Sequence, residues 1–221
     1  IISEIGDWFF SIAIFSYLLE KTGSAQSIAV AFAFQVLPQV LTAPAAGVIN
    51  DRLSRKKVLI FADWSRAVII LGMLLVTGFG AWWLLYVLLF LETVMWALFE
   101  PGRTAIVPNI TSDEDRPIAN ALSSATWAVN FMFGAALGGF VAAYFGRNTV
   151  FVIDAFSFAC SAWLIGRMTF DEPHASHGSR LRWKDLFDFS PIMEGVRYVR
   201  EDSRRWTAIL VKAGVGLIGT N

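Results

Sequence analysis

The sequence predicts an all-α integral membrane protein with six spanning helices and the start of a seventh. Its 221 residues are 56% hydrophobic and only 16% charged, and the mean hydropathy is +0.56. Soluble domains usually carry about a quarter charged residues. Three stretches, 22–50, 67–91 and 117–146, contain no charged side chain. Each exceeds the ~18 apolar residues that mark a spanning helix, and the chain length allows roughly six to seven spans.

Composition argues against several other classes of protein. The 18 basic and 18 acidic side chains cancel, so no global positive charge is available for nucleic acid. The two histidines, His174 and His177, lack a third ligand, and no metal site is expected. The single cysteine, Cys160, lies in an apolar stretch and is expected to be a core thiol. Without a nucleophile–base pair or a metal cluster in the sequence, neither an enzyme nor a cofactor is expected.

Turn signals divide the charge-free stretches into single spans. Glycine-containing turns at 22–24, 78–80 and 146–148 and polar loops at 51–57 and 109–117 supply the breaks. The expected spans are 5–20, 26–49, 58–77, 82–107, 118–145 and 149–167, with a seventh from about Trp206 that is cut off at Asn221. Both ends of the chain are expected to be truncated. Residues 1–167 should then form an N-terminal bundle, 168–205 a linker, and 206–221 the start of the seventh helix.

Basic residues are concentrated in alternate loops. The loops at 51–57, 109–117 and 168–205 hold nearly all of them, whereas the other loops hold only Lys21 and Arg147. The positive-inside rule therefore places the N-terminus and the 168–205 loop in the cytoplasm. Within that loop, apolar residues from Leu186 to Tyr198 recur at helical spacing. They predict an amphipathic helix on the cytoplasmic membrane face.

Two pairs of charged residues lie inside the expected spans, where each charge costs at least about 2.5–3.5 kcal/mol on insertion scales. Asp63 and Arg66 are three residues apart, and Glu100 and Arg103 repeat that spacing. Residues with this spacing share a helix face, so we expect each pair to neutralise itself as a structural ion pair.

Three further acids in the spans have no such partner. Glu92 lies near mid-span with no basic residue within a turn of its own helix. It suits a proton-carrying or cation-binding site in a water-filled cavity, although a structural role is equally open. Asp7 lies near the cytoplasmic end of its helix, where a solvated carboxylate costs little. Asp154 comes early in the sixth span and is expected to cap or hydrogen-bond a neighbour.

Uncharged residues in the spans suggest a cavity or helix packing. Gln35 and Asn130 could line a cavity, but interhelical hydrogen bonds explain them equally well. The spacing of Gly134 and Gly138, followed by Gly139, predicts a seam where two helices pack closely.

The connection between the second and third spans reads GVINDRLSRKKVLI from Gly47. The positive-inside rule explains its bases but not the acid beside them. This loop resembles the signature Gly-x-Leu-Ala-Asp-Arg-x-Gly-Arg-Arg of the major facilitator superfamily. The matching positions are Gly47, Asp51, Arg52, Arg55 and Lys56.

Other motifs in the same order resemble the drug- and siderophore-exporter branch, which includes the enterobactin exporters. They are Gly6-Asp7, Thr22-Gly23-Ser24, Asp63 with Arg66, the run from Pro101 to Pro108, Asn120-Ala121-Leu122, and Gly134 to Gly139 in place of Gly-Pro-x-x-Gly-Gly.

The resemblance implies a fold of two six-helix halves, each built from 3+3 inverted repeats, with substrate bound between the halves. The chain would supply the N-terminal half and depend on a missing C-terminal half. Asp51 and Arg55 would form a cytoplasmic latch, with Glu100 or Asp63 as partner for Arg55. The implied function is proton-coupled efflux of amphiphilic small molecules across a bacterial-type cytoplasmic membrane. The proton gradient would supply the energy, and the partners would be substrate, protons and the lipid bilayer, without nucleic acid.

These arguments define two sets of candidate residues. The expected substrate and proton pathway comprises Asp7, Gln35, Glu92, Trp96, Trp127 and Asn130. The expected gating residues are Gly47, Asp51, Arg52, Arg55, Lys56, Asp63, Arg66, Glu100 and Arg103. Two alternatives stay open: a lysolipid or lipid flippase on the same fold, and a half-size membrane scaffold or sensor that works through its 168–205 loop.

Overall fold

The computed structural model describes residues 2–112, 114–170, 172, 190–207 and 210–211. Every regular element in these ranges is an α-helix, so the predicted all-α class is confirmed there. The helices are α1 (Ile2–Thr22), α2 (Ala25–Arg52), α3 (Arg55–Phe79), α4 (Leu84–Ile110), α5 (Arg116–Phe145), α6 (Arg147–Arg167) and α8 (Ser190–Arg200). By length and composition, α2 to α6 could each cross a membrane.

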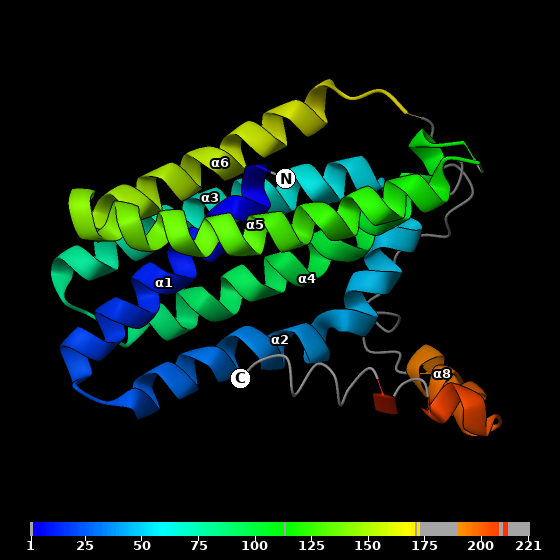
Figure 1. The fold of residues 1–221 in the computed structure, drawn as a ribbon, viewed down its shortest axis with the longest axis horizontal. Coiled ribbons are helices and arrows are strands. Elements are labelled where there is room, and N and C mark those ends of the chain that lie inside the picture. The colour runs from blue at the N-terminus through cyan, green and yellow to red at the C-terminus, as the bar shows by residue number, and fades with distance from the viewer. Residues whose placement is uncertain (1, 113, 171, 173–189, 208–209, 212–221) are drawn as a thin grey trace.

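Helices α1 to α6 form one elongated bundle, and α8 is drawn apart from it (Figure 1). The most extensive contacts join α3 with α6 and α4, and α2 with α4, while α1 packs against both α5 and α6. The apolar core lies between α1, α3, α4 and α6, where Ile14, Ile70, Leu85 and Phe158 are fully buried. This arrangement places α1 in the interior and brings its polar residues against the core helices.

Short capped connections join successive helices. The hydroxyl of Ser24 accepts a hydrogen bond from the Gln26 backbone nitrogen at the start of α2, and Ser54 caps α3 in the same way through Lys57. These caps satisfy backbone donors that the first helical turn leaves unpaired. Gly80 ends α3 with φ at +73°, a conformation that glycine adopts without strain.

The connection between α2 and α3 is shorter than the predicted loop at 51–57. Asp51 and Arg52 belong to the last turn of α2, and α3 already begins at Arg55, so only two residues lie between the helices. The α4–α5 connection is likewise shorter than 109–117, because α4 continues to Ile110 and α5 begins at Arg116. Charge density did not mark the loop limits, since charged residues are also tolerated in terminal helical turns.

Two glycines on α5 allow α1 to approach closely, as the sequence predicts. A Cβ atom on Gly134 would lie 2.8 Å from the Cβ of Trp8, and one on Gly138 would lie 2.8 Å from the Cα of Phe9. A side chain at either position would force the helices apart. The prediction was wrong for Gly139, where a Cβ would meet no atom within 4 Å.

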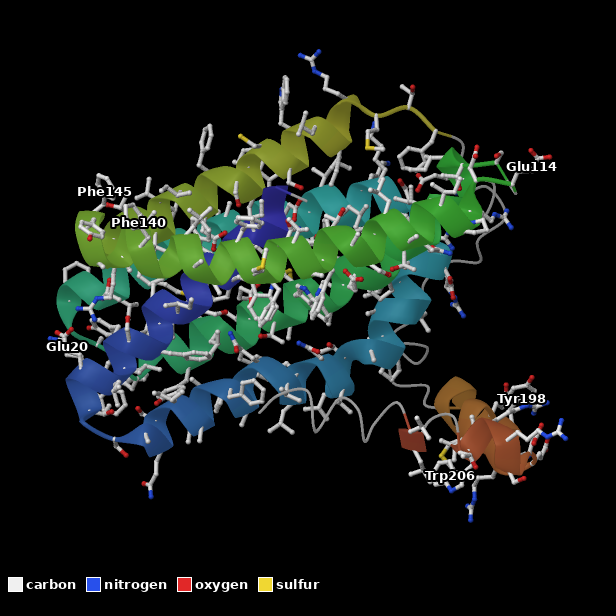
Figure 2. The ribbon with its side chains drawn as sticks, viewed as in Figure 1. Glu20, Glu114, Phe140, Phe145, Tyr198 and Trp206 are labelled. Atoms are coloured by element: carbon white, nitrogen blue, oxygen red, sulfur yellow. The ribbon has the colours of Figure 1, made fainter. Side chains whose placement is uncertain are left out.

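Within the predicted amphipathic segment, Leu186–Tyr198, the described residues belong to α8, which continues to Arg200, while 186–189 lie outside the described residues. Met193, Val196 and Tyr198 are exposed on α8, and the guanidinium of Arg205 lies 3.7 Å from the ring centre of Tyr198 (Figure 2). Its place on a membrane face stays a prediction. His174, His177, the rest of 173–189 and most of the predicted seventh span lie outside the described residues.

Candidate functional site

Arg66 of α3 is the centre of a buried charged group. Its side chain is 1% exposed, and its Nε and Nη2 donate to Oε1 of Glu92 at 2.9 and 2.7 Å. Nη2 also donates to Oδ1 of Asp7 on α1. Asp63 contributes a weaker contact, 4.0 Å from its Oδ1 to Nη1 of Arg66. Three helices therefore direct carboxylates at one guanidinium.

This geometry changes the interpretation of the Asp63–Arg66 pair. The two residues do share a face of α3, but the hydrogen bonds of Arg66 go to Asp7 and Glu92. The expected Asp63–Arg66 ion pair is present at 4.0 Å, but sequence spacing could not reveal the stronger partners of Arg66 on other helices. Glu92 has no basic neighbour on its own helix, and Arg66 of α3 is its basic partner.

A fourth carboxyl group belongs to the same region. Asp154 of α6 is fully buried, and its Oδ1 accepts a 3.3 Å hydrogen bond from the hydroxyl of Ser157. Gly6 lies directly against it, because a Cβ at Gly6 would overlap the Asp154 carboxylate. The guanidinium of Arg66 lies 4.1 Å above the ring of Phe158, one turn along α6. We call Asp7, Asp63, Arg66, Glu92 and Asp154 the central cluster.

A second charged group, the rim cluster, comprises Glu4, Glu100, Arg103 and Asn130. Arg103 donates two hydrogen bonds to Glu100, at 2.7 and 3.0 Å, as the sequence predicts. It also lies 3.3 Å from Glu4 of α1, which accepts a 2.8 Å hydrogen bond from the amide of Asn130 on α5. Sequence reasoning missed Glu4, although its place three residues before Asp7 puts it on the same helix face.

A cavity of about 410 Å³ lies between the two clusters, with walls from α1, α2, α4 and α5 and Arg66 from α3. It brings together five of the six residues expected on the substrate and proton pathway: Asp7, Gln35, Glu92, Trp96 and Trp127. The sixth, Asn130, is buried and reaches the cavity wall through Glu4. Gln35 also joins α2 to α1, because its amide donates to the Ser11 hydroxyl at 3.2 Å.

One side of the cavity is an aromatic cluster on α1 and α5. The rings of Trp8 and Trp127 meet edge to face with centroids 6.1 Å apart, and Phe131 stacks on Trp127 at 5.9 Å. Such surfaces bind varied apolar groups. Sequence reasoning named Trp127 but missed Trp8, which lies one residue after Asp7.

The α2–α3 connection contains a third arrangement, built mainly on neutral partners. Arg55 donates to the backbone oxygens of Asn50 at 3.2 Å and Ala105 at 2.9 Å, which ties it to α2 and α4. Asp51 is 3.7 Å away and 76% exposed. The expected partners of Arg55 were wrong, since Glu100 pairs with Arg103 and Asp63 lies beside Arg66.

Asn50 and Gly102 explain how α2 and α4 come close enough for this contact. The buried amide of Asn50 donates to the backbone oxygens of Ala46 and Leu98 at 2.8 and 2.9 Å. Gly102 of α4 makes room, because a Cβ there would overlap the Asn50 side chain. Gly47, in contrast, has open space around it, and Arg52 ends α2 half-buried.

Glu172, after α6, is a further residue that the sequence did not single out. It accepts hydrogen bonds from the Ser54 hydroxyl at 2.6 Å and from the Lys56 backbone nitrogen at 3.1 Å. The ammonium of Lys56 donates to the backbone oxygen of Met168 at 2.6 Å. The chain after α6 is thus tied to the first turn of α3.

In the part of the chain that the structure describes, no group of three His, Cys, Asp or Glu residues is placed to hold a metal ion. The chemistry of the site is therefore that of carboxyl groups, one buried guanidinium and aromatic faces around a cavity.

Comparison with known proteins supplies the context for this site. A family model described as the Major Facilitator Superfamily matches residues 1–220. Macrolide efflux protein A of Streptococcus pyogenes is 24% identical over 212 residues, which cover 95% of this chain and 51% of that protein. The uncharacterised MFS-type transporter YfiS of Bacillus subtilis is 27% identical over 165 residues, 74% of this chain and 39% of the relative.

A putative bacilysin exporter, BacE of Bacillus subtilis, is 28% identical over 137 residues, 62% of this chain and 34% of the relative. The chain thus spans about half or less of the length of these curated relatives.

Proposed function

Because this chain belongs to the major facilitator superfamily, we propose that it is the N-terminal half of a proton-coupled exporter of amphiphilic small molecules. Transporters of this family are multi-pass membrane proteins, and the apolar helices α2 to α6 fit that environment. The two relatives named for efflux support export as the direction. Alternating access would require the second half, against which this half would rock.

The observation that carries the proposal is the cavity between the central and rim clusters. Its volume of about 410 Å³ falls within the range of small-molecule sites, and a second half facing it would enlarge it. Trp96 and Trp127 offer apolar faces, whereas Asp7 and Glu92 offer carboxylates. An amphiphilic substrate requires both an apolar surface and a polar or charged surface in its binding site. The excess of carboxylates over guanidinium groups favours a substrate with a positively charged group.

Proton coupling is supported by the same carboxylates. Asp7 and Glu92 line the cavity and share the guanidinium of Arg66. A proton or a cation that neutralises either carboxylate therefore changes the balance of charge around Arg66. Ionisable groups retained inside a membrane protein often serve as proton relays. The basic ends of α2 and α3 would face the cytoplasm by the positive-inside rule, in a bacterial-type cell membrane.

The test is accumulation of radiolabelled erythromycin, ethidium and tetraphenylphosphonium in cells that express the full-length transporter. Cells with the wild-type protein should accumulate less of at least one probe than cells with empty vector, and an uncoupler should remove the difference. Glu92→Gln should abolish this effect. Glu20→Gln is the matched control, since Glu20 is an exposed carboxylate near the far end of the bundle, paired with Arg147 (Figure 2).

Equal accumulation with wild-type protein and empty vector for all three probes would contradict the proposed export of amphiphiles. Efflux that persists unchanged in Glu92→Gln would contradict the role of Glu92 alone.

A further inference from the structure

The four carboxyl groups of the central cluster fall into two pairs with different access. Asp7 and Glu92 line the cavity and accept the hydrogen bonds of Arg66. Asp63 and Asp154 do not line it and are 0% exposed. Among the described residues, neither oxygen of Asp63 and only one oxygen of Asp154 accepts a hydrogen bond. Arg66 therefore donates its side-chain hydrogen bonds to Asp7 and Glu92, and almost no hydrogen-bond donor in the described part of the chain reaches Asp63 and Asp154.

Charge balance then constrains the protonation of the buried pair. Four ionised carboxylates against one guanidinium would leave three negative charges uncompensated in the interior of the helical bundle. An unpaired buried ion costs several kcal/mol, whereas a protonated carboxyl group is neutral. Protons are favoured on the two carboxyl groups to which Arg66 donates no hydrogen bond, Asp63 and Asp154. The hydroxyl of Ser161 on α6 lies beside the carboxyl group of Asp63.

We propose that Asp63 and Asp154 hold protons in the state shown, and that Asp63 releases its proton when Arg66 turns from the cavity pair to Asp63. This inference rests on the proposed function, because it assigns a structural mechanism to its coupling step. Neutralisation of Asp7 and Glu92 by a positively charged ligand removes the attraction that holds Arg66 at the cavity. The guanidinium then pairs with Asp63, whose O–H bond breaks, and the proton passes to water in the cavity.

The required movement of Arg66 is small. Its Nη1 is already 4.0 Å from Oδ1 of Asp63, three residues away on the same helix, so α3 need not shift. The ring of Phe158 lies 4.1 Å from the guanidinium carbon and can support the cation in either position. One proton leaves for each positive charge that binds, so the net charge of the cluster stays constant. That is the exchange that an antiporter needs.

The charged groups around the buried pair come from every helix packed on it. They are Asp7 and Glu4 from α1, Arg66 from α3 and Glu92 from α4, with Asp154 on α6. Glu4 is already paired with Arg103, which leaves Arg66 as the guanidinium shared by the two pairs. The release of protons should therefore depend on the charge at Asp7 and Glu92.

Infrared spectroscopy of the purified full-length protein tests whether Asp63 and Asp154 are protonated, because a protonated carboxyl group has a C=O stretching band separate from that of a carboxylate. At neutral pH, Asp63→Asn and Asp154→Asn should each remove one such band. Glu20→Gln should remove none. Because Asn imitates a neutral aspartic acid, both variants should fold with a thermal midpoint close to wild type. Bands that persist in both variants, or unfolding of both, would overturn the proposal.

The double variant Asp7→Asn/Glu92→Gln tests the turn of Arg66 without any ligand. It leaves Arg66 no anion in the cavity, so the guanidinium should pair with Asp63. The protonated band assigned to Asp63 should then weaken at neutral pH, and a carboxylate band should strengthen. Unchanged bands would overturn the two-position role of Arg66. Because these spectra need no transport, they can fail while proton-driven export is present, and export can fail while the bands respond as expected.

Discussion

Arg55 and Arg66 lie on the same side of α3, about three turns apart, and have opposite kinds of partner. Arg55 is held mainly by two backbone oxygens, which cannot gain or lose a proton. Arg66 is held by carboxylates from α1 and α4, which can. The first arrangement joins three helices in any protonation state. The second responds to whatever neutralises its partners, which is the property that a coupling site requires.

The largest loss of stability is expected from Arg66→Gln. It leaves the carboxylates of Asp7 and Glu92 without a counter-charge, and removal of one partner from a buried ion pair costs about 3–5 kcal/mol. The loss in the thermal midpoint of the full-length protein in detergent should be greater at pH 8 than at pH 5, because acid protonates the stranded carboxylates. Arg167→Gln, at an exposed site on α6, is the control. Equal stability of Arg66→Gln and wild type at pH 8 would contradict the claim that Arg66 stabilises the bundle through the carboxylates of the central cluster.

A smaller effect is expected from Arg55→Lys. Lysine keeps the charge but cannot reproduce the fork that spans the oxygens of Asn50 and Ala105. Hydrogen bonds to charged groups contribute about 1.5–3 kcal/mol, and this loss should be the same at pH 5 and pH 8 because the acceptors do not titrate. The thermal midpoint at the two pH values measures it. A loss that grows with pH would show that a carboxylate, and not a carbonyl, holds Arg55.

These two arginines also show what could be predicted from sequence. Charge-free stretches and turn signals located α1 to α6 within a few residues, because the absence of charge depends on the solvent around each helix. The position of Arg55 followed from its motif, but its partner did not, since Asn50 and Ala105 offer only backbone atoms, and every residue has those. The i, i+3 spacing of Asp63 and Arg66 was real, yet the stronger partners come from helices whose relative rotation no local pattern records.

The same reason explains why Glu172 was missed. Its role depends on where the chain after α6 passes the start of α3, which is a feature of tertiary structure. Glu4, in contrast, shares a helix face with Asp7 and could have been found by extending that face by one turn.

Glu172→Gln tests whether the tie between α6 and α3 matters for stability. The amide keeps the shape but loses the charge that strengthens the bonds from Ser54 and Lys56, so we expect a loss of about 1 kcal/mol. Glu114→Gln is the matched control, because Glu114 is an exposed acid at the same end of the bundle (Figure 2). Thermal midpoints of the two variants should differ. If both equal wild type, the contact does not stabilise the bundle.

The smallest effect on stability is expected from Asp51→Asn, and it bears most directly on the latch. Asp51 is 76% exposed and 3.7 Å from Arg55, so its removal should change stability by no more than about 0.5 kcal/mol. In the proposed transporter, a carboxylate so exposed would be accessible to the second half. Asp51→Asn should therefore leave the thermal midpoint unchanged and alter the rate of probe efflux. A loss of stability as large as that expected for Arg55→Lys, together with a loss of transport, would instead make Asp51 part of the structural contact between α2 and α3.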